Sequence, residues 1–358
     1  MLSLYLYLLI IGRGGGRLFL NVSKLLEIDG MISADGISGS RDCGGGSGGS
    51  LWIYVHIIKG NGKIKAIGGD GSKFGGGGSG GRIAVYFKVN ETFTRFKYSA
   101  YGGSGGSNSE AGGAGTVFLY HLIQEHRTLL IDNNGQSALN KHMTYSLLSQ
   151  EGGKAWIMPA SGIHHFADKD SLFHFEELQV FGSAHVAFWP RNKEPEKNMS
   201  LFFRYMIGDR TGMVHVGPGQ DLDLKRDEID LPFSVYVYKD GHLGLAPVTF
   251  IHGIEIILRG TLSHVLNITL HHGAELWLLH GGRTMNTSIH HFRFDFVRIQ
   301  DTSIVHAVTS PVKDPGITFY TRSMTIEGGG VMRGSRLTFL TTNLTIDDGG
   351  KLIADGLG

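Results

Sequence analysis

The sequence predicts an all-β protein wound as a parallel β-helix or closely related β-solenoid, with glycine-rich loops and the right-handed sense that parallel crossovers generally prefer. Three observations support this prediction. A glycine-rich tract followed by an apolar strand occurs four times at nearly constant spacing. A second sequence marker keeps the same period. No amphipathic helix longer than two turns is evident, so no crossover helix is available to connect parallel strands.

The first apolar residue of each strand sets the period of the repeat. These residues are Leu18, Leu51, Ile83 and Val117, which lie 33, 32 and 34 positions apart. A second strand in each repeat ends in a small residue, and these residues are Ala34, Ala66 and Ala100, 32 and 34 positions apart. Two markers with one period predict stacked repeats, in which the first apolar residues form a column.

Glycine is the second unusual feature, with 55 residues in a chain of 358. Glycine loses the most backbone entropy on folding, so such a content requires specific turns or close approaches of the chain. We interpret the glycine tracts as the corners and projecting loops of the coil, and the alanines as residues of its narrow interior. A flexible linker would show no fixed spacing.

The chain divides into four regions by composition. Residues 1–11 form an apolar strand or the remnant of a signal segment, and residues 12–130 form the glycine-rich solenoid repeats. Residues 131–230 are a less regular β segment, and residues 231–358 return to β-helix coils. The last stretch, 336–358, repeats the pattern of 17–39 and stops where a glycine loop should begin. Because neither end shows a cap, we expect a fragment of a longer solenoid.

The composition excludes several classes of protein. The formal net charge is +1, which gives no electrostatic case for binding nucleic acid or an anionic membrane. Hydrophobic residues make up 41% of the chain and fall in strand-like runs, which excludes disorder. No stretch reaches the roughly 20 apolar residues that span a bilayer as a helix.

The asparagines indicate the compartment. The single cysteine, Cys43, excludes an internal disulfide framework and any cysteine-based zinc site, and it is read as a loop residue that could form an intermolecular disulfide. Asn-x-Ser/Thr triplets exceed the number expected by chance, and their asparagines are Asn21, Asn90, Asn198, Asn267, Asn286 and Asn343. Such triplets accept glycans in the secretory pathway. An extracellular or cell-surface location is therefore predicted.

The order of motifs over residues 12–135 resembles a known class of proteins. The stretches "GGGRLFLNVSKLLEIDGMISADG", "GGGSGGSLWIYV", "GNGKIKAIGGDG" and "GTVFLYHL" are similar to those of large glycine-rich eukaryotic cell-surface proteins, of which plants have well-known examples. The resemblance implies a secreted or membrane-anchored ectodomain with a pectin-lyase-like parallel β-helix. It implies no established activity and no catalytic residues.

Candidate metal and nucleotide sites are few. The lysines in "GNGKIK" and "GGKAW" lack the hydroxyl residue of a phosphate loop, and Asp70 has no partner in register for a calcium β-roll. Histidines pair at His164–His165, His271–His272 and His290–His291. Adjacent strand residues face opposite sides, so a pair shares one metal only at a turn. Such a turn occurs at His271, with Glu275 and His280 nearby, but polar turn and surface histidines are the favoured explanation of the pairs.

Glycoside chemistry is the enzymatic alternative, because β-helices often carry polysaccharide hydrolases and lyases. Asp221 and Asp223 share a strand face, with Arg226 and Asp227 following, and Asp295 and Asp301 flank "FVRIQ". Charges that protect strand edges explain these residues as well. No familiar polygalacturonase segments and no nucleophile elbow are present.

These patterns favour a non-catalytic extracellular structural or adhesive module. No catalytic residue, cofactor or metal ligand is assigned. The expected partners are extracellular polysaccharides or matrix and surface proteins, without nucleic acid. A carbohydrate-active β-helix enzyme and a glycan-binding module remain open as alternatives.

Overall fold

The structure is a computed structural model that describes residues 12–90, 95–107, 109–137, 153–157, 172–189, 199–224, 226–308 and 316–354. In these residues the chain is all-β and has no helix, and its sheets are mostly parallel, as in a β-solenoid-like fold. Residues 1–11, the charged loop at 191–198 with Asn198, and the pair His164–His165 lie outside the described residues. The chain forms two compact units, residues 1–155 with 176–186, and residues 156–175 with 187–358.

The first unit contains two sheets, and its long strands follow the period of the sequence. The larger sheet has the order β1 (Arg17–Glu27), β3 (Ser50–Lys59), β5 (Arg82–Asn90), β7 (Thr116–His121), β8 (His126–Asp132) and β10 (Leu172–Phe181). The smaller sheet has the order β2 (Met31–Ser33), β4 (Lys63–Lys65) and β6 (Lys97–Ser99). One long strand, one short strand and the glycine segments between them make one repeat.

The predicted column of apolar residues is confirmed. Leu18 pairs in register with Leu51, Leu51 with Ile83, and Ile83 with Val117. Alternate residues of each strand face the core, so Leu51, Ile83 and Val117 are buried, whereas Leu18 in the first strand of the sheet is 38% exposed. The alanine marker is also confirmed, because Ala34, Ala66 and Ala100 are all buried in the same core.

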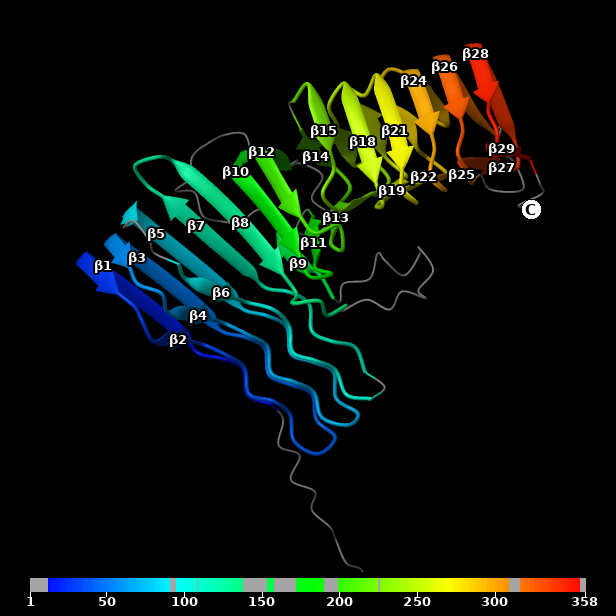
Figure 1. Cartoon of the computed structure of the whole chain (residues 1–358). Coiled ribbons are helices and arrows are strands. Elements are labelled where there is room, and N and C mark those ends of the chain that lie inside the picture. The colour runs from blue at the N-terminus through cyan, green and yellow to red at the C-terminus, as the bar shows by residue number, and fades with distance from the viewer. Residues whose placement is uncertain are drawn as a thin grey trace, which may run out of the picture. The chain divides into compact units, whose positions relative to one another are not determined.

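The glycine tracts, interpreted from the sequence as corners and projecting loops of the coil, are ordered by backbone hydrogen bonds. Each tract forms an outgoing and a returning segment, and the segments of successive repeats run side by side (Figure 1). Gly45 N–H donates to Gly76 O of the next repeat at 3.0 Å, and Gly46 N–H donates to Ile37 O of the outgoing segment at 2.9 Å. The same pair of bonds is repeated three residues further along the chain. Gly48 N–H donates to Ser79 O of the next repeat, and Gly49 N–H donates to Ala34 O of the outgoing segment. A period of three is that of a polyproline II helix, so the tracts form a hydrogen-bonded lattice of extended chains.

The lattice explains why these positions are glycine. A Cβ at Gly80 would lie 1.8 Å from Ala100 O, and one at Gly48 would lie 2.2 Å from Ala66 O. The third position of the period points away from the neighbouring chains and admits a side chain, as Ser47 and Ser79 do in "GGSGG". Glycine is therefore required by direct backbone contact with neighbouring segments rather than by flexibility.

One asparagine ends the lattice. Asn133 is buried, its Oδ1 accepts the Gly102 N–H at 2.9 Å, and its Nδ2 donates to Gly112 O at 3.1 Å. A single side chain thus satisfies one N–H group of an outgoing segment and one carbonyl group of a returning segment. The pairing also changes here, since β7 and β8 are antiparallel, whereas the sequence predicted parallel pairing throughout. The turn at Glu125, with φ of 51°, reverses the chain after only a few residues.

The second unit uses three parallel sheets that the chain visits in turn. The first sheet contains β12 (Met199–Gly208), β14 (Gln220–Asp223), β17 (His242–Gly244), β20 (Thr261–Ser263) and β23 (Arg283–Thr284). The second contains β13 (Met213–Val216), β16 (Ser234–Val237), β19 (Glu255–Leu258), β22 (Glu275–Leu278), β25 (Ile304–Ala307), β27 (Val331–Gly334) and β29 (Lys351–Ile353). The third contains β15 (Glu228–Asp230), β18 (Val248–His252), β21 (Asn267–His271), β24 (His291–Ile299), β26 (Ile317–Ile326) and β28 (Leu337–Ile346). Three strands, β9 (Ala155–Ile157), β10 and β11 (His185–Phe188), have residues in both units.

Apolar side chains from all three sheets fill the second unit. Leu222, Leu243 and Leu262 align on the first sheet, and each is at most 1% exposed. The alternation of polar and apolar residues in "DLD", "HLG" and "TLS" therefore places polar side chains on the outer face. Among the residues described, no helix has the length and apolar character needed to cross a membrane.

Candidate functional site

Aromatic side chains gather on the outer face of the first unit's larger sheet. We call this group the aromatic stripe, and its members are Phe19, Trp52, Tyr54, Tyr86, Phe118 and Tyr120. Phe19 is 62% exposed, Trp52 54% and Tyr54 40%. Neighbouring rings contact one another with centroids 5.7 to 6.3 Å apart. A contiguous exposed aromatic surface of this kind marks an interaction site.

Polar groups border the aromatic stripe. Asn21 stands in the same row as Tyr54, Tyr86 and Tyr120, because these residues pair in register across β1, β3, β5 and β7. The guanidinium of Arg127 lies over the Tyr120 ring at 4.9 Å. The stripe crosses four strands that are spaced ~4.8 Å apart, which gives a length of ~14 Å. Stacked rings with hydrogen-bonding groups at their margin suit a flat, amphipathic ligand.

The carboxylates Asp221 and Asp223 share an outer face, as the sequence predicted, and each lies beside a histidine. Asp221 Oδ1 contacts His242 Nδ1, and His242 Nε2 lies 2.7 Å from Ser263 Oγ. Asp223 Oδ1 lies 3.6 Å from His264 Nδ1. A Cβ at Gly244 would lie 2.6 Å from Asp223 Oδ1, so glycine leaves the space that this carboxylate occupies.

The contacts of Asp221, His242 and Ser263 have the atom order of a hydrolase triad. Only 4% of Ser263 is exposed, however, so a substrate carbonyl has little access to its hydroxyl. The three residues come from β14, β17 and β20 and link three repeats through side-chain hydrogen bonds. We interpret them as a stabilising network. Sequence reasoning missed His242 and Ser263, although the repeated polar–Leu–polar pattern was the available signal.

Another histidine, His306, is buried in β25, a strand of the second sheet of the second unit. His306 is 2% exposed, and its ring stacks on Trp277 with centroids 3.6 Å apart. The Arg333 Nε–H donates to His306 Nδ1 at 2.9 Å, whereas Glu275 Oε2 lies 3.0 Å from Nε2 without hydrogen-bond alignment. Burial and the positive charge of Arg333 lower the pKa of His306 to about 4. Burial and the nearby Glu275 carboxylate raise the pKa of Glu255.

The lowered pKa of His306 predicts acid sensitivity. The pKa of His306 is 6.5 in the unfolded chain and about 4 in the folded chain, so between these values the unfolded chain binds the proton more tightly. Above pH 6.5 neither state is protonated, and stability is unaffected. Stability is then lost as the pH falls from 6.5 to 4, by roughly 2–3 kcal/mol for this residue. His306→Gln keeps an acceptor for Arg333 and does not titrate. Urea unfolding at pH 7.5 and 4.5 should show a smaller pH-dependent loss in this variant, and an unchanged loss would contradict the assignment.

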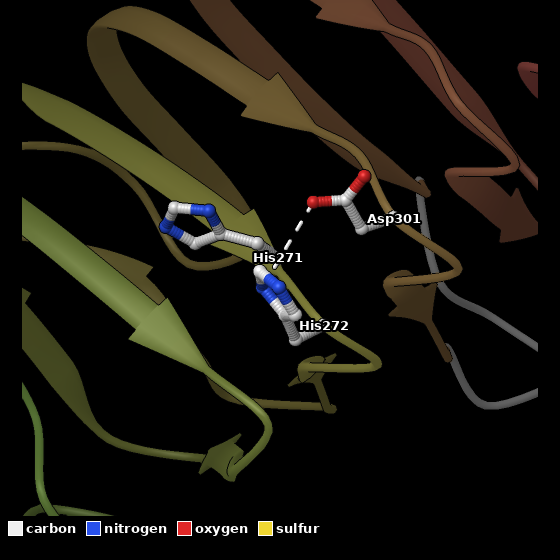
Figure 2. A group of neighbouring side chains, drawn as sticks. All are labelled: His271, His272 and Asp301. Carbon is white, nitrogen blue, oxygen red and sulfur yellow. Dashed lines mark ion pairs between the residues drawn. The ribbon is translucent and has the colours of Figure 1, made fainter.

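The third cluster lies at a corner of the second unit and is shown in Figure 2. His271 ends β21, His272 follows in a turn with φ of 54°, and Asp301 occupies the turn after β24 with φ of 51°. The positive φ of His272 interrupts the alternation of strand residues, so both imidazoles and the Asp301 carboxylate offer one ligand atom each within 4.8 Å of one another. We call these three residues the His–Asp corner.

The other candidates lie apart from these clusters. Glu275 contacts His306 rather than the His–Asp corner, and His280 packs beside His290. Asp295 lies within β24, while Arg226 covers the ring of Tyr205 and Asp227 is exposed. Two candidates in the glycine lattice have structural explanations. Asp70 Oδ1 accepts the Ser104 N–H at 2.8 Å, and Cys43 is buried, which disfavours the intermolecular disulfide suggested by the sequence.

The asparagines of the glycosylation triplets differ in exposure. Four of those described are exposed, namely Asn21, Asn90, Asn286 and Asn343. Asn267 is half-buried in β21, and its Oδ1 is buried. A glycan acceptor must be accessible to the solvent, so the four exposed asparagines fit that role better than Asn267.

Comparison of the chain with protein-family models, curated proteins and solved structures gives no match.

Proposed function

We propose that this chain is a non-catalytic extracellular module, wound as a right-handed parallel β-helix, that adheres to polysaccharide along the aromatic stripe. The secretory pathway would deliver it to the cell surface as an N-glycosylated part of a larger glycine-rich surface protein. The aromatic stripe is the observation that supports this function. Exposed rings on a rigid sheet can stack on the apolar faces of sugar rings, while Arg127 and the tyrosine hydroxyls can bond sugar hydroxyls.

Several features favour polysaccharide over a protein partner or a second copy of the chain. The stripe is narrow and crosses successive strands in one direction, which suits a linear polymer. Its margin carries hydrogen-bonding groups, whereas a homodimer interface is mostly apolar at its core. The asparagine of one glycosylation triplet, Asn21, lies in register with Tyr54, so a glycan there would extend beside the ligand-binding face.

The proposal predicts that aromatic substitutions in the stripe weaken polysaccharide binding. The full chain, expressed through a secretory pathway, would be applied to a glycan array and to immobilised plant and microbial polysaccharides. Trp52→Ala and Tyr86→Ala should each weaken binding by about tenfold or more, because each removes a stacking surface. Phe74→Ala is the matched control, since Phe74 is 55% exposed in the same unit but lies outside the stripe.

Four further results would overturn parts of the proposal. No binding by either the glycosylated chain or Asn21→Gln would exclude the adhesive function, and dimerisation lost in Trp52→Ala would assign the stripe to a second copy. Depolymerisation of a bound polymer that is abolished in Asp221→Asn would favour the enzymatic alternative. Absence of a gel shift after glycosidase treatment would remove the support for the secretory pathway.

A further inference from the structure

The His–Asp corner combines two imidazole nitrogens and one carboxylate oxygen, all within 4.8 Å of one another. Divalent transition metals, and Zn²⁺ in particular, bind such donor sets at 2.0 to 2.2 Å per ligand, which places tetrahedral ligand atoms about 3.4 Å apart, so side-chain rotation must bring these donors closer by up to about 1.4 Å. Calcium and magnesium prefer oxygen ligands alone. The chemistry of the donors therefore selects a transition metal.

The donors come from adjacent repeats, and the backbone holds them in place. His271 and His272 belong to the turn between β21 and β22, while Asp301 belongs to the next turn of the column, between β24 and β25. The Gly273 N–H donates to Asp301 O at 2.9 Å and fixes the distance between the two turns. Because the turns are joined by main-chain bonding, little rearrangement is needed to place the three ligands.

Neighbouring side chains orient the two imidazoles. Gln300 Nε2 lies 3.1 Å from His271 Nδ1, and the His252 ring stacks on His272 with centroids 4.2 Å apart and planes 12° apart. A glutamine amide nitrogen only donates, so metal binding by His271 requires the Gln300 amide to turn its oxygen toward the ring N–H, while the His252 ring holds the orientation of His272. His272 and Asp301 have 61% and 49% of their side chains exposed, so solvent can reach the corner and supply the remaining ligands.

We propose that the His–Asp corner binds one Zn²⁺ ion, or a divalent transition metal of similar preference, through His271, His272 and Asp301. The metal would join two successive repeats of the second unit and stabilise their stacking. Binding requires neutral imidazoles, so protons compete with the metal for the two histidines. The inference is independent of polysaccharide binding by the first unit.

The test uses the full chain without a histidine tag, stripped of metal by a chelator and then titrated with ZnCl₂ at pH 7.5 by calorimetry. We expect one ion per chain with a dissociation constant on the order of 1–100 µM, and a rise in the melting temperature of the second unit at saturating metal. Co²⁺ should give the visible absorption bands of an imidazole-bound ion.

Two conservative variants locate the site. His272→Asn preserves a residue that tolerates positive φ, and Asp301→Asn keeps the shape of the side chain. Each should weaken Zn²⁺ binding at least about tenfold while the circular dichroism of the chain is unchanged. His264→Asn is the matched control, because His264 is also an exposed histidine beside an aspartate, 3.6 Å from Asp223. It should bind as the unchanged chain does.

The inference fails if millimolar ZnCl₂ produces neither heat nor a rise in melting temperature. It also fails if His272→Asn and Asp301→Asn bind as tightly as the unchanged chain, since the ion would then lie on other histidines. If pH alone changes stability and metal does not, the corner is only the exposed ion pair between His272 and Asp301, whose atoms are 3.9 Å apart.

Discussion

Gly80→Ala is expected to unfold the first unit, although it adds only one methyl group. The new Cβ would lie 1.8 Å from Ala100 O and 2.5 Å from Gly115 N, and both atoms belong to backbone that is itself hydrogen-bonded into the lattice. Since no side chain can move aside, whole segments must separate. The expected loss exceeds ~4 kcal/mol, which places the substitution among the most damaging kinds of single change.

Gly76→Ala is the control in the same tract. The nearest heavy atom to its Cβ would be Glu110 O at 3.5 Å, an ordinary contact distance. This variant should change stability by less than about 1 kcal/mol, and it can even be stabilising, because alanine restricts the unfolded chain. Urea unfolding followed by circular dichroism compares the two variants. Similar midpoints would contradict the lattice.

Leu51→Ala is expected to cost 2–5 kcal/mol, the usual range for a buried leucine that leaves a cavity. Leu51 is 2% exposed and stands between Leu18 and Ile83 in the column of the first unit. Its loss removes apolar contacts within its own repeat and with the repeats on both sides.

Leu18→Ala makes the same chemical change at a position of the same column that is 38% exposed. It should cost about 1 kcal/mol, because less apolar surface leaves water there and the site can relax. Equal losses for the two leucines, measured by urea unfolding, would show that the column does not set the stability of the unit.

The repeat and its apolar column were predictable because both depend on side-chain period. A position that recurs every 32 to 34 residues and is always Leu, Ile or Val has one simple explanation, and Leu18, Leu51 and Ile83 align accordingly. The lattice was harder to predict. Glycine carries no side chain that reveals which neighbour it contacts, and only the three-residue spacing of Ser47 and Ser50 in "GGGSGGS" hints at the threefold period.

The candidate sites depended on geometry that the sequence does not contain. His242 and Ser263 contact each other although β17 and β20 align His242 with Thr261, so the contact runs diagonally between strands. The two histidines of the His–Asp corner converge because His272 adopts a positive φ, which histidine adopts only occasionally. The aromatic residues of the stripe can be seen in the sequence. That their rings contact one another depends on the register of four strands, which the sequence does not show.

The asparagine at position 133 has a consequence for how such proteins vary in length. Its one amide group satisfies the Gly102 N–H and the Gly112 carbonyl of the last glycine layer, so this contact does not depend on how many layers precede it. Duplication or deletion of an entire upstream repeat would leave the contacts of Asn133 intact. Insertion or deletion of part of a repeat would instead shift the glycines out of the three-residue spacing of the backbone hydrogen bonds between tracts. Changes in size should therefore occur in whole repeats.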